Sequence, residues 1–298
     1  MEGCNHITYF TKKIMKKILI LVIVGIITLL IIGCNNNSMA DNQKANFEST
    51  SVENRDNKAV TTGDVDINIK SNETIDEKIP LGNINNINIE ISAENISIKA
   101  YDGEEIKITG KLSEKSRDIS INKKDDKFEM IETGYDLIQT FMNNENDKSI
   151  IDVLIPSKFK GEFALKQGAG LAEVEGIKVK YINISGGVGK LECNNINFDR
   201  LNLNSGVGKI DLNLNEKCGD IEINGDVGET NIKMKEVGGN LKYRGSVGSI
   251  NIKIPENSPV KFDVEKGVGS YNINAKTSGE QTYIFDLKSG VGTINITN

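Results

Sequence analysis

A short glycine motif recurs through the second half of the chain at an almost constant interval. Most copies read Gly-Val-Gly or end in Val-Gly, and the last glycine returns every 19 to 23 residues. These seven glycines are Gly170, Gly189, Gly208, Gly228, Gly248, Gly269 and Gly292. A fixed period in this range is typical of repeat proteins, in which each unit buries its apolar face only against its neighbours. The sequence therefore predicts a stack of similar units.

Apolar side chains occupy the same places in every unit. The positions seven and five residues before the glycine, and four residues after it, are apolar or aromatic in all seven copies, and polar residues alternate with them. This alternation predicts two half-buried strands per unit, with the glycines at the corner between them because they accept backbone angles that a side chain blocks. The valine of the motif is expected to point inward.

These features predict an all-β fold, a parallel β-solenoid with rungs of about 20 residues over 161–298. In such a stack like residues lie above like residues at a spacing of about 4.8 Å, so Leu203 should lie between Ile184 and Ile223. An antiparallel meander, with each glycine motif as a hairpin loop, is the alternative.

The region before the repeats is expected to be an atypical β cap, residues 64–160. Residues 84–112 alternate in the same way but lack the glycine motif, and solenoids need such terminal units. The segment 135–148 interrupts the alternation and is predicted to be a loop or a short helix. The final strand, 293–298, ends the chain abruptly and is expected to leave an open sheet edge.

An export signal precedes all of this, in residues 1–33. Two lysines are followed by the apolar run Ile18–Ile32, then Gly33 and Cys34. A small residue directly before a cysteine resembles a bacterial lipoprotein lipobox, which implies cleavage before Cys34 and its acylation as a membrane anchor. An uncleaved transmembrane anchor is the alternative, although the run is short of the roughly 20 residues that a span requires.

The polar stretch 34–63 cannot bury enough apolar surface to fold and is predicted to be a disordered tether. Met15 is an alternative start of the chain. Either form of anchor places the rest of the protein on the extracytoplasmic face of the cell membrane.

The histidine content and the net charge exclude several kinds of catalytic site and binding partner. The only histidine, His6, lies in the leader, so the exported chain would have no Ser-His or Cys-His catalysis and no imidazole metal ligand. The formal charge of −6 argues against nucleic acid as a partner, because phosphate contacts need a basic face. No cofactor is predicted. Besides Cys4 and Cys34, the chain has Cys193 and Cys218, which either form a disulfide or are two small buried side chains.

One polar column is a weak candidate for a cation site. Three residues after each repeat glycine stand Glu173, Glu192, Asp211, Asn231, Asn251, Asn272 and Asn295. Stacked carboxylates at Glu173, Glu192 and Asp211 would repel one another unless Ca²⁺ or another charge intervened. Lys190 and Lys209 on the same face offer that charge, and stacked asparagines form ladders. The simpler hypothesis is therefore a solvated column.

A second set of charged residues raises the alternative of an enzyme that cleaves polysaccharides. Asp220, Glu222 and Asp226 with Arg244 resemble the acids and bases of parallel β-helix enzymes, but scattered surface charge explains them equally well. Aromatic platforms for sugars are scarce. We therefore expect a protein that is not an enzyme.

Three stretches suggest a family. "NISIKAYDGEEIKITG" (95–110), "IIDVLIPSKFKGEFAL" (150–165) and the serial glycine units resemble the bacterial "putative adhesin" family of β-strand-repeat domains of unknown function. The resemblance covers 64–298 and implies no catalytic residues. It implies a surface-exposed β-repeat domain. Together with the lipobox, it leads to the hypothesis of a surface-exposed envelope lipoprotein that acts in adhesion or protein interaction, with envelope proteins or surface glycans as partners. The alternative is an accessory or sensor protein of an envelope-stress system.

Overall fold

The computed structural model describes residues 63–133 and 149–298, which lie within one compact unit, Ala59–Asn298. The predictions for the leader 1–33 with its anchor at Cys34, for the tether up to residue 62 and for 135–148 therefore lie outside the described residues. Every described core residue belongs to this unit, so it has its own hydrophobic core and can be studied without residues 1–58.

The described residues form fifteen strands. They are β1 (Val65–Ile69), β2 (Thr74–Pro80), β3 (Asn86–Ile91), β4 (Asn95–Tyr101), β5 (Glu105–Lys111), β6 (Ile119–Lys124), β7 (Lys127–Glu132), β8 (Ile150–Pro156), β9 (Glu162–Glu175), β10 (Tyr181–Asn194), β11 (Arg200–Leu214), β12 (Asp220–Met234), β13 (Leu241–Lys253), β14 (Val260–Ile273) and β15 (Tyr283–Thr297).

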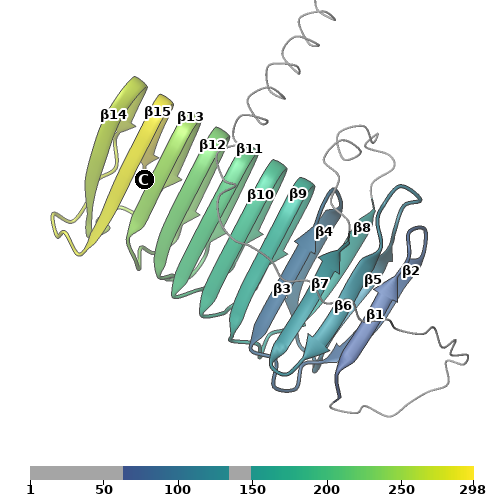
Figure 1. Ribbon diagram of the computed structural model, residues 1–298. Helices are drawn as coiled ribbons and strands as arrows, with labels where there is room; N and C mark the ends of the chain where they lie inside the picture. The colour runs from purple at the N-terminus through teal and green to yellow at the C-terminus, as the bar shows by residue number, and fades with distance from the viewer. Residues whose placement is uncertain (1–62, 134–148) are drawn as a thin grey trace, which may run out of the picture. The chain divides into compact units, whose positions relative to one another are not determined.

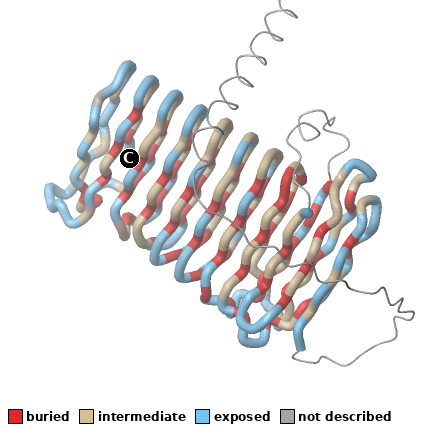
Figure 2. Tube along the Cα trace, in the orientation of Figure 1, coloured by how far each residue is buried: buried red, intermediate tan, exposed pale blue. Residues whose placement is uncertain are grey.

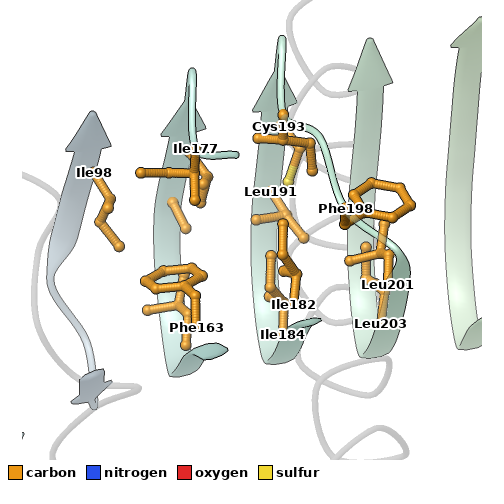
Figure 3. Close-up of a cluster of buried hydrophobic side chains, with 14 of the residues drawn as sticks. Ile98, Phe163, Ile177, Ile182, Ile184, Leu191, Cys193, Phe198, Leu201 and Leu203 are labelled. Atoms are coloured by element: carbon orange, nitrogen blue, oxygen red, sulfur yellow. The ribbon is translucent and has the colours of Figure 1, made fainter. Parts of the chain in front are cut away.

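The strands join in one stacked sheet (Figure 1). Its main path runs β1-β6-β7-β3-β9-β10-β11-β12-β13-β15-β14, and every pairing from β9 to β15 is parallel. The predicted parallel β-solenoid is confirmed, and the meander of hairpins is wrong for the repeats. The register is also as predicted, because Leu203 pairs with Ile184 on one side and Ile223 on the other. Figure 3 shows like side chains repeating from rung to rung.

Each rung is one long strand rather than two. The strands β9 to β15 are 13 to 15 residues long and continue through the glycine motif, where they bend. In β11 the buried residues are odd-numbered before the bend, Leu201 and Leu203, and even-numbered after it, Ile210 and Leu212. The alternation therefore changes phase at the bend, so that both legs of the rung face one interior (Figure 2).

This change of phase explains why the inward direction predicted for the motif valine is wrong. Val227, Val247 and Val291 are 45–49% exposed, and Val268 is 71% exposed. If the alternation of the first leg continued, the valine would face the core. The bend places it on the convex outer corner instead.

The repeat glycines form a column at the bend. Gly189 and Gly208 have φ angles of 141° and 153°, which L side chains rarely adopt. A Cβ atom added at Gly208 would lie 1.8 Å from the carbonyl oxygen of Gly189 in the adjacent rung. The bend therefore depends on two properties of glycine, its conformational freedom and its lack of a side chain.

The segments that link successive long strands supply a third set of core side chains. Ile177, Ile196, Phe198 and Val237 lie on these links and are at most 5% exposed. The interior is thus enclosed by the two legs of each strand and by the links, and Figure 3 shows Ile177 and Phe198 among the other core side chains.

The N-terminal region contains rungs of its own. The strands β3 and β4 together pair in parallel with the two legs of β9, and β7 and β8 pair in parallel with β3 and β4 on the other side. Beyond them the pairing becomes antiparallel, β6 and β1 on one leg and β5 and β2 on the other. Short antiparallel strands therefore close this end of the stack.

At the other end, the order of the last two rungs is exchanged. The final strand β15 pairs with β13 and with β14, so it lies between them. The contacts of the glycine column agree, since a Cβ at Gly292 would meet Gly248 and one at Gly269 would meet Gly292. The prediction that the last strand of the chain forms the open edge is wrong, because that edge belongs to β14.

The two described cysteines are free and buried. Cys193 lies on the second leg of β10 and Cys218 on the link before β12. Burial raises the pKa of Cys193 to about 12 and that of Cys218 to about 11. The choice that the sequence left open is therefore settled in favour of two small buried side chains.

We expect both thiols to be unreactive in the folded protein. The thiolate is the nucleophile, and a pKa raised by burial keeps these groups protonated at pH 8. The chain 35–298 contains no other cysteine. Titration with a thiol reagent at pH 8 should therefore label neither cysteine in buffer and both in 6 M guanidinium. Rapid labelling of either thiol without denaturant would contradict the burial.

Candidate functional site

The second legs of the rungs carry a ladder of polar side chains on their outer face. Asn231 donates to the carboxylate of Asp211 at 2.8 Å, and Asn251 donates to Asn231 at 2.8 Å. The ladder continues as Asn295 donates to Asn251 at 2.8 Å, and Asn272 to Asn295 at 2.9 Å. Each step joins neighbouring rungs, so the column expected from the sequence is brought together, with Asn295 before Asn272 because β15 precedes β14 in the stack.

The acidic beginning of this column is neutralised by lysines. Lys190 forms ion pairs with Glu192 and, at 3.7 Å, with Asp211. Lys99 of β4 lies 3.5 Å from Glu173. The hydrogen bond from Lys190 to Glu192 raises the pKa of Lys190, as expected for an ammonium group held beside carboxylates. Within 63–133 and 149–298, no cluster of three or more His, Cys, Asp or Glu side chains has the geometry of a metal site.

A shallow groove of about 700 Å³ runs along the ladder. Its walls are the ladder itself and the adjacent outward column, which includes Asn194, Asn213, Lys233 and Lys253. Asn213 donates to Asn194 at 2.8 Å, so this second column begins as another amide pair. The groove has no aromatic wall and few apolar ones. Its chemistry is that of an extended array of hydrogen-bond donors and acceptors.

The four residues of the polysaccharide-enzyme hypothesis do not form one site. Asp220 accepts hydrogen bonds from Asn240, and Glu222 pairs with Lys242 at 2.7 Å. Arg244 pairs with Asp286 of β15, which raises the pKa of the arginine. Asp226 borders the same shallow depression as Arg244, at the bend of the strands. Asp220, Glu222 and Arg244 each link neighbouring rungs through a partner of their own.

Two acidic side chains, the buried Glu94 and the half-buried Glu132, stand in place of the glycine motif in the N-terminal rungs. Glu94 is 3% exposed and accepts a hydrogen bond from the backbone N–H of Ser149 at 3.0 Å. Glu132 accepts from the backbone N–H of Ser92. Each carboxylate thus satisfies a backbone donor of the neighbouring rung. The sequence pattern did not reveal these contacts, because Glu132 is 40 residues from Ser92 in the sequence and Glu94 is 55 residues from Ser149.

We expect Glu132→Gln to stabilise the protein at pH 7. Burial, reinforced by Glu94, raises the pKa of Glu132 above its usual 4.5, so the ionised form is disfavoured in the folded state. Protonated Glu132 contributes its full stability to the folded wild type below pH 4.5, and this contribution is lost as the pH rises through the raised pKa. A glutamine at this position stays neutral at every pH and keeps an oxygen that accepts the hydrogen bond from Ser92.

Thermal unfolding between pH 4 and pH 7 checks this expectation. The melting temperature of Glu132→Gln should exceed that of the wild type at pH 7, and the difference should shrink toward pH 4. Glu129→Gln, on the same strand, controls for the loss of a charge. A variant that is less stable than the wild type at pH 7 would show that the charged hydrogen bond outweighs the cost of burial.

No described residue belongs to a helix with the length and apolarity of a membrane span. No curated protein matches this chain. Among solved structures, a "putative cell adhesion protein" from Clostridium sporogenes is 18% identical with a TM-score of 0.39, covering 76% of this chain and 98% of its own. A "putative adhesin" from Bacteroides fragilis is 17% identical with a TM-score of 0.39, covering 79% and 98%.

The family comparison covers the repeats themselves. Residues 84–216 match the Toastrack DUF4097 family, and residues 162–297 match it a second time. The two matches overlap within the stack and together include all seven repeat glycines. The chain, with its parallel rungs and glycine-lined bends, therefore belongs to the Toastrack DUF4097 family.

Proposed function

We propose that this protein is a non-enzymatic adhesion module of the cell envelope, which binds a hydroxyl-rich polymer along the groove of the asparagine ladder. One observation carries the proposal: Asp211, Asn231, Asn251, Asn295 and Asn272 form an unbroken hydrogen-bonded column that lines the groove. Within the ladder each asparagine donates one N–H to its neighbour, and Asn231, Asn251 and Asn295 also accept one hydrogen bond. Asn231 also donates to Glu229 at 2.8 Å, so the second N–H groups of Asn251, Asn295 and Asn272 are the amide donors that the ladder leaves for a ligand.

The spacing of the ladder suits a polymer. Neighbouring amides are separated by one rung, about 4.8 Å, and so offer donors and acceptors at a regular interval. Ligand sites for apolar molecules are lined mainly by hydrophobic and aromatic side chains, whereas this groove has no aromatic residue and only Ile232 and Ile252 as large aliphatic ones. A surface glycan, with hydroxyl groups along its length, matches the groove better than an apolar ligand does.

Binding of the chain 35–298 to a panel of bacterial surface polysaccharides tests this proposal. We expect Asn231→Ala combined with Asn251→Ala to weaken binding at least tenfold while the melting temperature falls by only a few degrees. Asn183→Ala is the matched control, because Asn183 is an exposed asparagine on the first leg of β10, away from the groove. Equal binding by the ladder variant and the control would refute the proposed site.

The anchor is part of the same proposal. Lipidation at Cys34 would hold the module on the extracytoplasmic face of the membrane, with the polar residues that follow as a spacer. In cells expressing the full chain, labelled palmitate should enter the wild type and the control Cys4→Ala but not Cys34→Ala. Equal labelling of all three, or of none, would remove the lipid anchor without affecting the groove.

A further inference from the structure

The two ends of the solenoid differ in how they are closed. At the N-terminal end the edge strands are short, β1 has five residues, and β2 ends at Pro80, which has no N–H to donate. Such edges resist pairing with another chain. At the other end lies β14, with fourteen residues, which among the described strands pairs only with β15 (Figure 1). The stack is therefore closed at one end and open at the other.

The open end also exposes apolar side chains. Phe285 and Leu287 of β15 are fully buried, whereas Phe262 and Val264, which pair with them in β14, are only partly buried. Val268 and Ile273 of the same strand are 71% and 41% exposed. A long sheet edge with an uncovered apolar face is a site for the addition of another strand.

The backbone of the first leg of β14 faces outward at its apolar residues. Tyr283 of β15 donates to the carbonyl of Pro259 at 3.0 Å. Because alternate residues of a strand direct their N–H and C=O groups to opposite edges, Phe262 and Val264 direct both groups to the open edge. Val260 offers only its carbonyl there, since its N–H donates to the carbonyl of Ser258 at 2.9 Å. These are the same residues whose side chains lie over the core.

The charges on this leg suggest what pairs with it. Lys261 and Asp263 lie on the outer face on either side of Phe262, are exposed, and have no ion-pair partner among the described residues. A strand that meets its own copy across a two-fold axis pairs antiparallel. If Phe262 lies on the axis, Lys261 of each copy stands opposite Asp263 of the other. If the two-fold axis passed through Asp263, the Asp263 side chains of the two copies would face each other. If it passed through Val264, Asp263 of one copy would face Glu265 of the other.

We propose that the open edge of β14 joins two copies of this chain end to end, by antiparallel pairing centred on Phe262. In this register the outward-directed backbone groups meet as well: Phe262 and its copy exchange both hydrogen bonds, and the N–H of Val264 faces the carbonyl of Val260 of the other copy. Lys261 and Asp263 form two cross-strand ion pairs, and the two open ends of the cores cover one another.

Two segments of the same chain are poor occupants of this edge. The fifteen residues 134–148 start and end at β7 and β8, eight strand positions from β14, about 38 Å away. Out and back, fifteen residues reach no more than about 26 Å. Residues 35–62 are long enough, but they lack the alternating apolar residues needed to cover Phe262 and Val264.

Charge exchange tests the register. In analytical ultracentrifugation of the chain 35–298 at micromolar concentration, we expect a dimer. Lys261→Glu and Asp263→Lys should each raise the dissociation constant at least tenfold, because each places like charges in opposition. Lys261→Asp combined with Asp263→Lys should restore the dimer. Lys235→Glu, the same charge change at an exposed site that follows β12 and lies outside the groove, is the control and should have no effect.

Cross-linking and solution scattering test the geometry. Under mild oxidation Phe262→Cys should form a disulfide between two copies, since directly opposed residues have Cα atoms about 5.5 Å apart. Val264→Cys, which lies opposite Val260, should not. The stack measures about 48 Å from β1 to β14, so the dimer should roughly double the longest dimension. A monomer at 100 µM, a head-to-tail polymer, or a dimer unaffected by both charge reversals would each overturn the proposal.

Discussion

Gly208→Ala is expected to destabilise the protein by about 4 kcal/mol, enough to unfold the central rungs under mild denaturing conditions. Two costs add. The φ of 153° at Gly208 is one that L residues rarely adopt, and the new Cβ would lie 1.8 Å from the carbonyl oxygen of Gly189. That carbonyl belongs to a rung held on both sides, so it cannot retreat without disturbing its own pairing.

Gly225→Ala is the matched control, because a Cβ there meets no atom within 4 Å and the residue has no positive φ. Thermal unfolding should show a fall of roughly 10 °C for Gly208→Ala and little change for Gly225→Ala. Amide exchange should locate the loss of protection in β10, β11 and β12. Similar melting temperatures for the two variants would mean that the glycine column is not a structural requirement.

Phe285→Ala is expected to cost about 3–5 kcal/mol, and Phe262→Ala considerably less. The two phenylalanines occupy the same place in their rungs and contact each other edge to face, with ring centroids 6.0 Å apart. Because β15 lies inside the stack, Phe285 is fully buried, while Phe262 is on the last rung and only partly buried. The same substitution thus leaves a closed cavity at one site and an open one at the other.

Chemical denaturation of both variants measures this difference. Both are best made in a chain that carries Lys261→Glu, so that association through β14 does not contribute. If the rungs stacked in the order of the sequence, Phe262 would be internal and Phe285 terminal, and the ranking would be reversed. A larger loss for Phe262→Ala would therefore contradict the exchanged order of the last two rungs.

The candidate site was visible in the sequence only in part. The period of the glycines placed Asp211, Asn231 and Asn251 in one column, and the chemistry of asparagine suggested a ladder. The groove beside it was not predictable, since it depends on how the rungs bend and on a second column, Asn213 and Lys233 among them. The acidic residues Glu94 and Glu132 lie in rungs that lack the glycine motif, so no repeat marked those positions.

The sequence by itself determined the rung. The spacing of buried residues such as Ile184, Leu203 and Ile223 sets the register, because a shift by one residue would turn every apolar side chain to solvent. Only the tertiary structure decided the order of the rungs. The strand β15 lies between β13 and β14. The rung of β3 and β4 lies between β9 on one side and the rung of β7 and β8 on the other. Both insertions are possible because neighbouring rungs offer nearly equivalent surfaces. The choice among such surfaces depends on the long-range packing of links, caps and ends, which a local periodic pattern does not encode.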